Sequence, residues 1–415
     1  MKKTIALGLG LISVFCLWAQ PKKVLFLGNS YTSVNNLPQL IQNVGYSFGD
    51  SIVFNQNTPG GYQFVQHVSN ATTLSKIKAQ DWDFVVLQEQ SQKPSFPPAQ
   101  VQTDVYPYAK QLNDSIKANF SCTETVFYMT WGRKNGDAQN CAFYTPLCTY
   151  AGMQQRLRES YMEMADSNLS TVAPVGVAWK NVRDSFPTIE LYQVDESHPS
   201  IHGSYLAACV FYATIFQKSA VGSTYVPAGI SASDALILQT VASNTVLDSM
   251  ELWRINANLP VADFGFSGGN SINFTSTSTN GMYYYWDFDD GNNSVLEHPN
   301  HTYNTNGNYN VELIVFSQDS CFSDTISKLV SVTTVGLNKS EQGAKVKIFP
   351  NPAKDQLKVM ANQENLTFRL IDIYGNILKE QKEEVIDLTA YASGLYFIVV
   401  LKDGEMIARN KVIKE

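Results

Sequence analysis

The sequence has few histidines and cysteines, and none of them are arranged as metal ligands usually are. Its 415 residues include five histidines and six cysteines, with no Cys-x-x-Cys pair and no His/Cys cluster at metal-ligand spacing. Basic residues are fewer than acidic ones, which gives a formal net charge of −7. An acidic chain does not favour nucleic acid or an anionic membrane surface as a partner. We therefore expect no metal, no cofactor and no nucleic-acid partner.

Long apolar runs are absent after the first 19 residues. Residues 1–19 carry two lysines, an apolar stretch from Ile5 to Leu17, and then Trp18-Ala19, which is typical of a secretory signal peptide cleaved after Ala19. Cys16 could suggest a lipoprotein anchor, but the bulky Phe15 before it does not suit lipoprotein processing. No later stretch is long and apolar enough to span a membrane. The mature chain is predicted to be exported, and without Lys2 and Lys3 its formal charge is −9.

Export places the remaining cysteines in an oxidising environment, where disulfides form. Cys141 and Cys148 lie in one segment with Pro146 and could close a local disulfide. Cys209 lies in the apolar run 206–216, which is typical of an inert core thiol. The cysteines left after cleavage are Cys122, Cys141, Cys148, Cys209 and Cys321. Their odd number predicts at least one free thiol.

The mature chain begins with an apolar run that stops at a polar turn. Val24 to Leu27 carries no charge, which predicts a strand buried on both faces, as in a parallel sheet. Gly28-Asn29-Ser30 follows, so Ser30 would lie at the carboxyl end of the strand, where α/β proteins bind ligands. Ser30 is therefore a candidate nucleophile, and a turn or helix-cap serine is the structural alternative.

Strand and helix patterns alternate up to about residue 217, which predicts a parallel sheet flanked by helices. The predicted strands are 24–27, 51–55, 84–87, 126–131 and 174–179. The predicted helices are 37–46, 101–120, 153–166, 181–185 and one that ends near 217. Gly60-Gly61 follows the second strand and Gln88 follows the third. The glycines form either an ordinary turn or a close backbone approach to a substrate oxygen.

A second candidate for chemistry lies in the loop 191–203. Asp195 precedes His198 by three residues, so its carboxylate could bind the imidazole Nδ1 and leave Nε2 free to take a proton from a serine. Alone, this pattern is weak, because a single histidine is usually a surface or packing residue. Together with Ser30 it forms a possible catalytic triad.

These motifs, in this order, resemble the SGNH (GDSL-like) hydrolases over about residues 22–250. The resemblance implies a three-layer α/β/α, flavodoxin-like fold in which Ser30 attacks esters, His198 acts as base and Asp195 orients it. It also implies an oxyanion hole formed by the Ser30 N–H, a glycine N–H at Gly60 or Gly61, and a side-chain amide.

The chain departs from that family where the side-chain amide is expected. The family usually has asparagine in a Gly-x-Asn-Asp sequence, whereas this chain has Gln88 in Leu87-Gln88-Glu89-Gln90-Ser91. A subfamily of SGNH-like proteins with Gln-Glu-Gln-Ser looks similar. We expect Gln88 to donate to the oxyanion and Glu89 to be a structural partner, because a negative charge beside the oxyanion would oppose catalysis.

Residues 257–262 form a linker into a different composition. Over 263–335, short alternating strands separated by Asn, Asp and Gly predict an immunoglobulin-like β-sandwich. Trp286-Asp287-Phe288-Asp289-Asp290-Gly291 and the later His-x-Tyr pattern closely resemble a PKD domain. The spacing of His298 and His301 suits no standard metal site, and the resemblance implies that His301 is a packing residue. The domain would serve as a spacer or as a weak glycan- or protein-binding module.

A polar linker, 336–343, leads to a second predicted small sandwich, 344–415. Its Phe349-Pro350-Asn351-Pro352 opening and its Gly394-Leu395-Tyr396-Phe397-Ile398 strand are similar to the C-terminal sorting domain of type IX secretion substrates. The resemblance implies a Bacteroidetes-type bacterium, interaction with the type IX machinery, and release or anchoring at the cell surface. The type IX route removes this domain, so the final product would end near residue 343.

The leading hypothesis is a secreted serine esterase that removes acyl groups, plausibly acetyl, from a polysaccharide or another small ester, and that acts as a monomer. The alternative is a non-catalytic surface protein for glycan binding or adhesion on the same scaffold. A lipase is less favoured, since no apolar segment that could form a lid is present.

Overall fold

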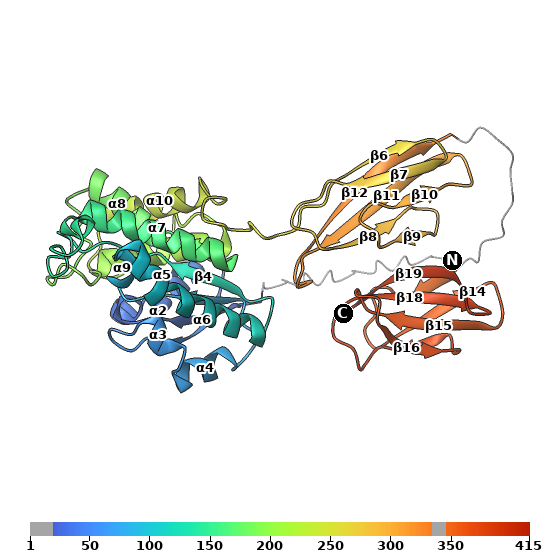
Figure 1. The fold of residues 1–415 in the computed structure, drawn as a ribbon, viewed down its shortest axis with the longest axis horizontal. Coiled ribbons are helices and arrows are strands. Elements are labelled where there is room, and N and C mark those ends of the chain that lie inside the picture. The colour runs from blue at the N-terminus through green and yellow to red at the C-terminus, as the bar shows by residue number, and fades with distance from the viewer. Residues whose placement is uncertain (1–19, 334–345) are drawn as a thin grey trace, which may run out of the picture. The chain divides into compact units, whose positions relative to one another are not determined.

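A computed structural model describes residues 20–333 and 346–415 of the chain (Figure 1). The predicted signal peptide, 1–19, and the linker 336–343 lie outside the described residues. The chain divides into two compact units, one that ends at Ala257 and one that runs from Asn258 to Glu415.

The first unit is built on a five-stranded parallel sheet with strand order β2-β1-β3-β4-β5. These strands are β1 (Lys22–Leu27), β2 (Ile52–Asn57), β3 (Phe84–Leu87), β4 (Glu124–Tyr128) and β5 (Thr171–Ala173). Residues 24–27 of β1 are at most 1% exposed, because the strand has another strand on each side and helices over the sheet. This order is that of a doubly wound sheet, as predicted, and its carboxyl edge is the expected place for a site.

The longer helices of this unit form one connected series, because α7 contacts both α6 and α8. The helix α2 packs against α9, which also contacts α8 and α10, whereas α6 packs against α4 and α7. Their bounds are α2 (Leu37–Tyr46), α4 (Ala71–Ile77), α6 (Tyr106–Asn119), α7 (Tyr150–Asn168), α8 (Val175–Ser185), α9 (Ile201–Phe216) and α10 (Ala232–Leu247). The shorter helical segments are α1 (Ser30–Ser33), η1 (Val34–Asn36), α3 (Phe64–His67), η2 (Lys93–Ser95), α5 (Pro98–Asp104) and η3 (Thr145–Cys148).

The predicted strand 174–179 is wrong, because this segment is the start of helix α8. The fifth strand is the shorter β5, which ends one residue before Pro174. The helix buries Val175, Ala178 and Trp179, so its apolar run has the composition of a buried strand. Short apolar runs of this kind do not distinguish a buried strand from a buried helix.

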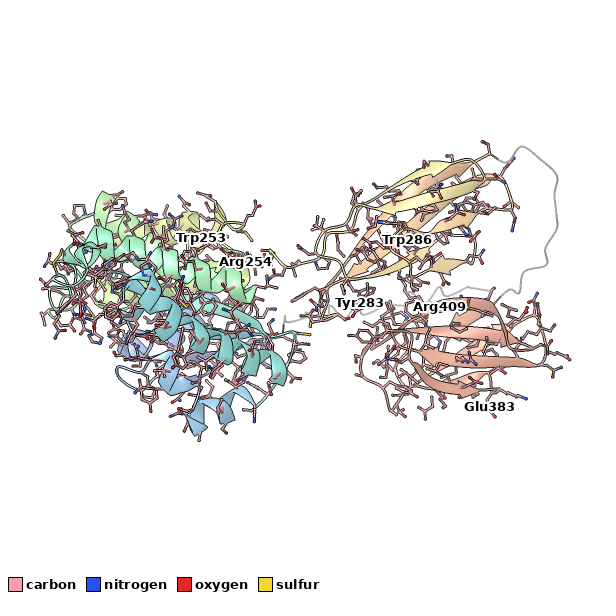
Figure 2. The ribbon with its side chains drawn as sticks, viewed as in Figure 1. Trp253, Arg254, Tyr283, Trp286, Glu383 and Arg409 are labelled. Carbon is pink, nitrogen blue, oxygen red and sulfur yellow. A yellow bond between two sulfur atoms is a disulfide. The ribbon has the colours of Figure 1, made fainter. Side chains whose placement is uncertain are left out.

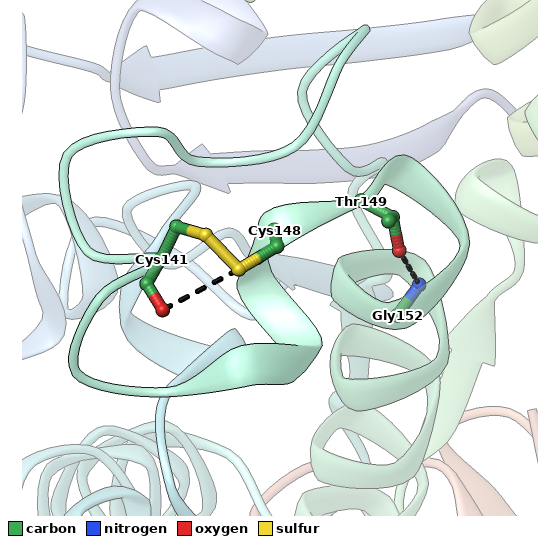
Figure 3. Close-up of a disulfide and its surroundings, with 4 residues drawn as sticks. All are labelled: Cys141, Cys148, Thr149 and Gly152. Carbon is green, nitrogen blue, oxygen red and sulfur yellow. Dashed lines mark hydrogen bonds between the residues drawn. A yellow bond between two sulfur atoms is a disulfide. The ribbon is translucent and has the colours of Figure 1, made fainter.

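The predicted local disulfide is confirmed: Cys141 and Cys148 are bonded and close the loop that leads into α7 (Figure 3). The helix α7 then begins at a threonine cap, where the Gly152 N–H donates to Thr149 Oγ1 at 3.1 Å. Cys209 is a free, fully buried thiol in α9, as predicted. Within the described residues, no helix combines the length and the apolar character that crossing a bilayer requires.

The second unit contains two antiparallel β domains. In residues 264–332, two sheets with orders β10-β7-β6 and β12-β11-β8-β9 enclose an aromatic core around the fully buried Trp286 (Figure 2). The strands are β6 (Phe264–Gly268), β7 (Ser271–Ser276), β8 (Tyr283–Asp287), β9 (Asn293–Ser294), β10 (Asn300–Thr302), β11 (Gly307–Phe316) and β12 (Ser323–Val332). The predicted all-β sandwich is therefore present here.

Residues 346–415 form the second of these domains, with sheet orders β13-β14-β17 and β16-β15-β18-β19. Its strands are β13 (Val346–Phe349), β14 (Gln356–Ala361), β15 (Leu366–Ile371), β16 (Ile377–Gln381), β17 (Val385–Asp387), β18 (Gly394–Lys402) and β19 (Glu405–Lys414). Alternate residues of β14 and β15, such as Leu357, Val359 and Phe368, are buried between the sheets.

Candidate active site

Ser30 lies at the carboxyl edge of the sheet, three residues after β1 ends. It is the first residue of α1, and Asn29 caps this helix by accepting a hydrogen bond from the Tyr31 N–H at 3.1 Å. The cap forces the chain to turn directly after the strand. The Ser30 side chain is therefore presented at the sheet edge and not along the strand.

The three residues predicted as a triad lie together. His198 Nε2 is 2.8 Å from Ser30 Oγ, and His198 Nδ1 is 2.5 Å from Asp195 Oδ2. The other carboxylate oxygen, Asp195 Oδ1, accepts hydrogen bonds from the backbone N–H groups of Ser197 (3.1 Å) and His198 (3.0 Å). The order Asp195–His198–Ser30 gives the imidazole one carboxylate partner and one hydroxyl partner.

The electrostatics of Asp195 suit a carboxylate that stays ionised. Partial burial acts to raise its pKa, but the hydrogen bonds from the His198 side chain, the His198 N–H and the Ser197 N–H outweigh burial, so the pKa lies below its usual range. The side chains of His198 and Asp195 keep 31% and 44% of their surface exposed. Both side chains are therefore open to solvent.

Aromatic residues hold the loop that carries Asp195 and His198. Tyr31 places its hydroxyl 2.6 Å from Ser197 Oγ and its ring edge against His198, with ring centres 5.4 Å apart. Trp131, which follows β4, donates from Nε1 to the Ser197 carbonyl at 3.1 Å. Trp131 is stacked between Tyr31 and Trp179, with ring centres 4.8 and 3.9 Å apart. The turn that begins at Ser30, the loop that carries His198 and the loop after β4 are thereby joined in one packed group.

The Gln88 side chain is turned into the protein. It has no exposed surface, and its Oε1 accepts hydrogen bonds from the Asn29 N–H at 2.9 Å and from the Thr32 hydroxyl at 3.0 Å. Its Nε2 donates to the Glu89 carbonyl. This geometry differs from the predicted donation to an oxyanion, because both ends of the amide have protein partners. Gln88 instead fixes the peptide between Gly28 and Asn29, one residue before Ser30.

Three backbone N–H groups near the site remain available. In the described structure, the N–H groups of Ser30, Gly60 and Gly61 donate no hydrogen bond. Gly61 has a φ of +71°, and no atom lies within 4 Å of the place where a side chain would begin on either glycine. The Asn29 Nδ2 donates to the Tyr62 carbonyl at 2.8 Å, which ties the glycine turn to the nucleophile turn.

Two buried ionisable residues, Glu89 and His67, make hydrogen bonds to backbone groups near the site. Glu89 accepts hydrogen bonds from the Phe64 N–H (2.9 Å) and the Gln90 N–H (2.6 Å), consistent with the structural role predicted for it. Burial raises the pKa of Glu89 to about 8, although these bonds act to lower it. His67 Nε2 lies 2.9 Å from the Gly28 carbonyl, which can only accept, so Nε2 carries a proton. Burial lowers the pKa of His67, although its bond to Gly28 acts to raise it.

The histidines of the second unit have structural contacts. His301 stacks on Phe288 at 4.1 Å between ring centres, and its Nε2 is 2.7 Å from Asp290 Oδ2. His298 Nδ1 accepts from the Ser276 N–H at 3.2 Å. Across residues 20–333 and 346–415, no three His, Cys, Asp or Glu side chains gather as metal ligands would.

Family models match the two C-terminal domains. Residues 259–332 match a model described as a PKD domain, and residues 347–415 match a secretion system C-terminal sorting domain. The sorting domain, which belongs to type IX secretion, indicates a secreted or cell-surface protein and implies interaction with the secretion machinery. Among curated proteins, none matches this chain.

Solved structures are similar to the first domain. A DUF4886 family protein from Bacteroides uniformis is 20% identical, with a TM-score of 0.48, over 55% of this chain and 95% of its own. A putative SGNH hydrolase from Slackia heliotrinireducens is 27% identical, with a TM-score of 0.38, over 46% of this chain and 97% of its own. The psychrotrophic esterase EstA from a Pseudoalteromonas species is 14% identical, with a TM-score of 0.34, over 47% of this chain and 97% of its own. What the structure itself shows for the first domain is a five-stranded parallel α/β sheet with strand order β2-β1-β3-β4-β5.

Proposed function

We propose that this protein is a secreted serine esterase that uses Ser30, His198 and Asp195 as its catalytic triad. The observation that carries the proposal is the pair of contacts made by His198, 2.8 Å to the serine hydroxyl and 2.5 Å to the aspartate carboxylate. A hydroxyl, an imidazole and an ionised carboxylate in this order are the groups that activate a serine nucleophile.

In the proposed mechanism, Ser30 Oγ attacks the carbonyl carbon of the ester while His198 Nε2 takes the hydroxyl proton. Asp195 holds the Nδ1 proton and stabilises the positive charge that develops on the imidazole. His198 then returns the proton to the leaving alcohol, which departs and leaves an acyl group on Ser30. A water molecule activated by His198 attacks this acyl group, and the carboxylic acid is released with Ser30 restored.

The oxyanion is proposed to bind to backbone groups. The unpaired N–H of Ser30, together with Gly60 or Gly61, supplies donors that are fixed before the reaction, which is the requirement for stabilising charge in the transition state. Gln88 acts on this site indirectly, because it holds the Asn29 N–H and so sets the direction of the Ser30 peptide.

The substrate class follows from where the site lies and where the protein goes. The half-exposed triad is open to a polymer, and the sorting domain sends the protein out of the cell. An acyl ester, with acetyl as the favoured group, on an extracellular polysaccharide fits both observations.

Hydrolysis of p-nitrophenyl acetate by residues 20–415 tests this proposal. We expect measurable turnover that falls at least about 10³-fold in both Ser30→Ala and His198→Ala, with unfolding temperatures near that of the parent protein. Retention of most of kcat in Ser30→Ala would show that the nucleophile is misassigned. Acetate release from acetylated polysaccharides then identifies the natural ester.

A further inference from the structure

Two strands of the second unit are apolar on both faces, and the first of them is β11 of the PKD domain. Val311, Leu313 and Val315 lie in the core of that domain, whereas the alternate residues Ile314 and Phe316 lie in a different buried cluster. Successive residues of a strand point to opposite faces of the sheet, so Ile314 and Phe316 face away from the domain's own core. An antiparallel sheet with one face in water alternates apolar and polar residues. The pattern of β11 therefore indicates that both of its faces are covered.

The strand β18 of the sorting domain has the same pattern. Ile398 and Val400 lie in the core of that domain, whereas Phe397, Val399 and Leu401 lie in the second cluster. The alternation places these three residues on the outer face of their sheet. Each sandwich has a core of its own, so the outer residues serve another purpose than holding their own domain together.

The two outer faces cover each other. The docking cluster, as we call it, consists of seven side chains that are at most 9% exposed: Tyr285, Ile314 and Phe316 from the PKD domain, and Ile371, Phe397, Val399 and Leu401 from the sorting domain. The ring centres of Tyr285 and Phe397 lie 4.7 Å apart. Without its counterpart, each face would expose several large apolar side chains together, which marks an interaction surface.

Polar contacts between the same two sheets accompany the docking cluster. Glu312, on the outer face of β11, pairs with Lys411 of β19 at 3.0 Å. Asn293 of β9 donates from Nδ2 to the Arg409 carbonyl of β19. An apolar centre combined with hydrogen bonds and an ion pair is the composition of an interface between proteins.

We propose that the PKD domain is the binding partner of the sorting domain, and that the two stay associated after the linker between them is cut. The docking cluster supplies the apolar part of the interface, and the Glu312–Lys411 pair fixes how the two sheets are aligned. Cutting the linker removes none of these contacts and only makes the association bimolecular. The proposal does not depend on the esterase activity, and it gives the PKD domain a partner within its own chain.

Cleavage of the linker tests the proposal. A site-specific protease sequence is inserted into the linker 336–343 of residues 20–415, and the cut protein is studied by sedimentation velocity at about 10 µM. Most of the fragment that contains 344–415 should sediment with the rest of the protein, which corresponds to a Kd of about 1 µM or tighter for an interface of ordinary size. Two fragments that sediment separately would overturn the proposal.

Substitutions on the outer face of β11 identify the contacts responsible. Ile314→Asp places a charge in the docking cluster and should weaken the association at least about 10-fold. Leu329→Asp is the matched control, because Leu329 lies opposite Asn310 on the same face of the sheet but is 63% exposed, and it should leave Kd unchanged. The unfolding temperature of each uncut variant shows that the domains remain folded. A parent Kd in Ile314→Asp would refute the proposal.

The ion pair provides a test that leaves the apolar contacts in place. Glu312→Lys sets two lysines against each other and should weaken the association about 3- to 10-fold. Addition of Lys411→Glu restores opposite charges and should return Kd to the parent value. An unchanged Kd in Glu312→Lys, or no recovery in the double variant, would contradict the alignment of the two sheets by this pair.

Discussion

The peptide between Gly28 and Asn29, one residue before Ser30, is held from both sides. On one side, Gln88 Oε1 accepts a hydrogen bond from the Asn29 N–H. On the other side, the Gly28 carbonyl accepts a hydrogen bond from the His67 Nε2–H. A side chain at Gly28 would begin 2.6 Å from Gln88 Oε1, so only glycine leaves room for this contact. The buried amide and imidazole thus set the position of a nucleophile that they do not touch.

Replacement of Gln88 distinguishes a positioning role from an oxyanion role. Gln88→Ala leaves the buried Asn29 N–H and Thr32 hydroxyl without their acceptor, at a cost of about 1–3 kcal/mol each. We expect the unfolding temperature of the first domain to fall by roughly 5–10 °C, with kcat reduced about tenfold. The control is Gln100→Ala on the exposed side of α5, which should change neither quantity. A loss of 10²-fold or more in kcat at an unchanged unfolding temperature would instead place Gln88 in the oxyanion hole.

Glu89 predicts a dependence of stability on pH. Its pKa of about 8 in the folded protein lies above its usual value of about 4.5, so between these values the folded state holds a proton that the unfolded chain releases. The stability from this group is therefore present at low pH and is lost as the pH rises through 8. From pH 5.5 to 8.5, the free energy of unfolding should fall by about 3 kcal/mol more in the parent protein than in Glu89→Gln. Denaturant titrations at the two pH values measure this, and parallel changes in both proteins would contradict it.

Ser30, Asp195 and His198 could be predicted from the sequence, because Ser30 follows a buried strand and Asp195 precedes His198 by three residues in a loop. The sequence offers no sign of Tyr31 or Trp131, whose partner Ser197 lies 166 and 66 residues away along the chain. It also could not show that Gln88 faces inward, since a side-chain amide serves equally as an oxyanion donor and as a backbone partner.

Among the elements, the loop after β4 decides how firmly the triad loop is held. Trp131 stacks on Tyr31 and Trp179 and donates to the Ser197 carbonyl, two residues after Asp195. The alternation of strands and helices was predictable from the apolar runs. The helical state of residues 175–179 was not, because burial on all sides removes the polar face that marks a surface helix.

Trp131→Phe tests the contribution of this loop. Phenylalanine keeps an aromatic ring in the stack but loses the N–H that binds Ser197, so we expect kcat/KM for p-nitrophenyl acetate to fall about fivefold, as for the loss of one hydrogen bond. Trp82→Phe is the matched control, since that indole also donates to backbone carbonyls, those of Lys76 and Ile77. Equal catalytic losses in the two variants would contradict a specific role for Trp131.

At the scale of the whole molecule, the C-terminal sorting domain determines where the protein goes. Deletion of residues 344–415 should leave an active esterase in the periplasm, because this segment directs export and contributes nothing to the triad. Cell fractionation with an esterase assay measures how the activity is distributed between the periplasm and the cell surface. Full-length Ser30→Ala, which should be exported normally, shows how much of the measured activity comes from other esterases. Appearance of the truncated protein at the cell surface would refute this role.

The most direct test of the account is covalent labelling of the nucleophile. A fluorophosphonate reacts with a serine that a neighbouring base has activated, so residues 20–415 should take up one equivalent, with the adduct on the peptide that contains Ser30. Labelling should be absent in Ser30→Ala and slowed at least about 10²-fold in His198→Ala. Mass spectrometry that finds no adduct, or finds it on another serine, would contradict the proposed triad.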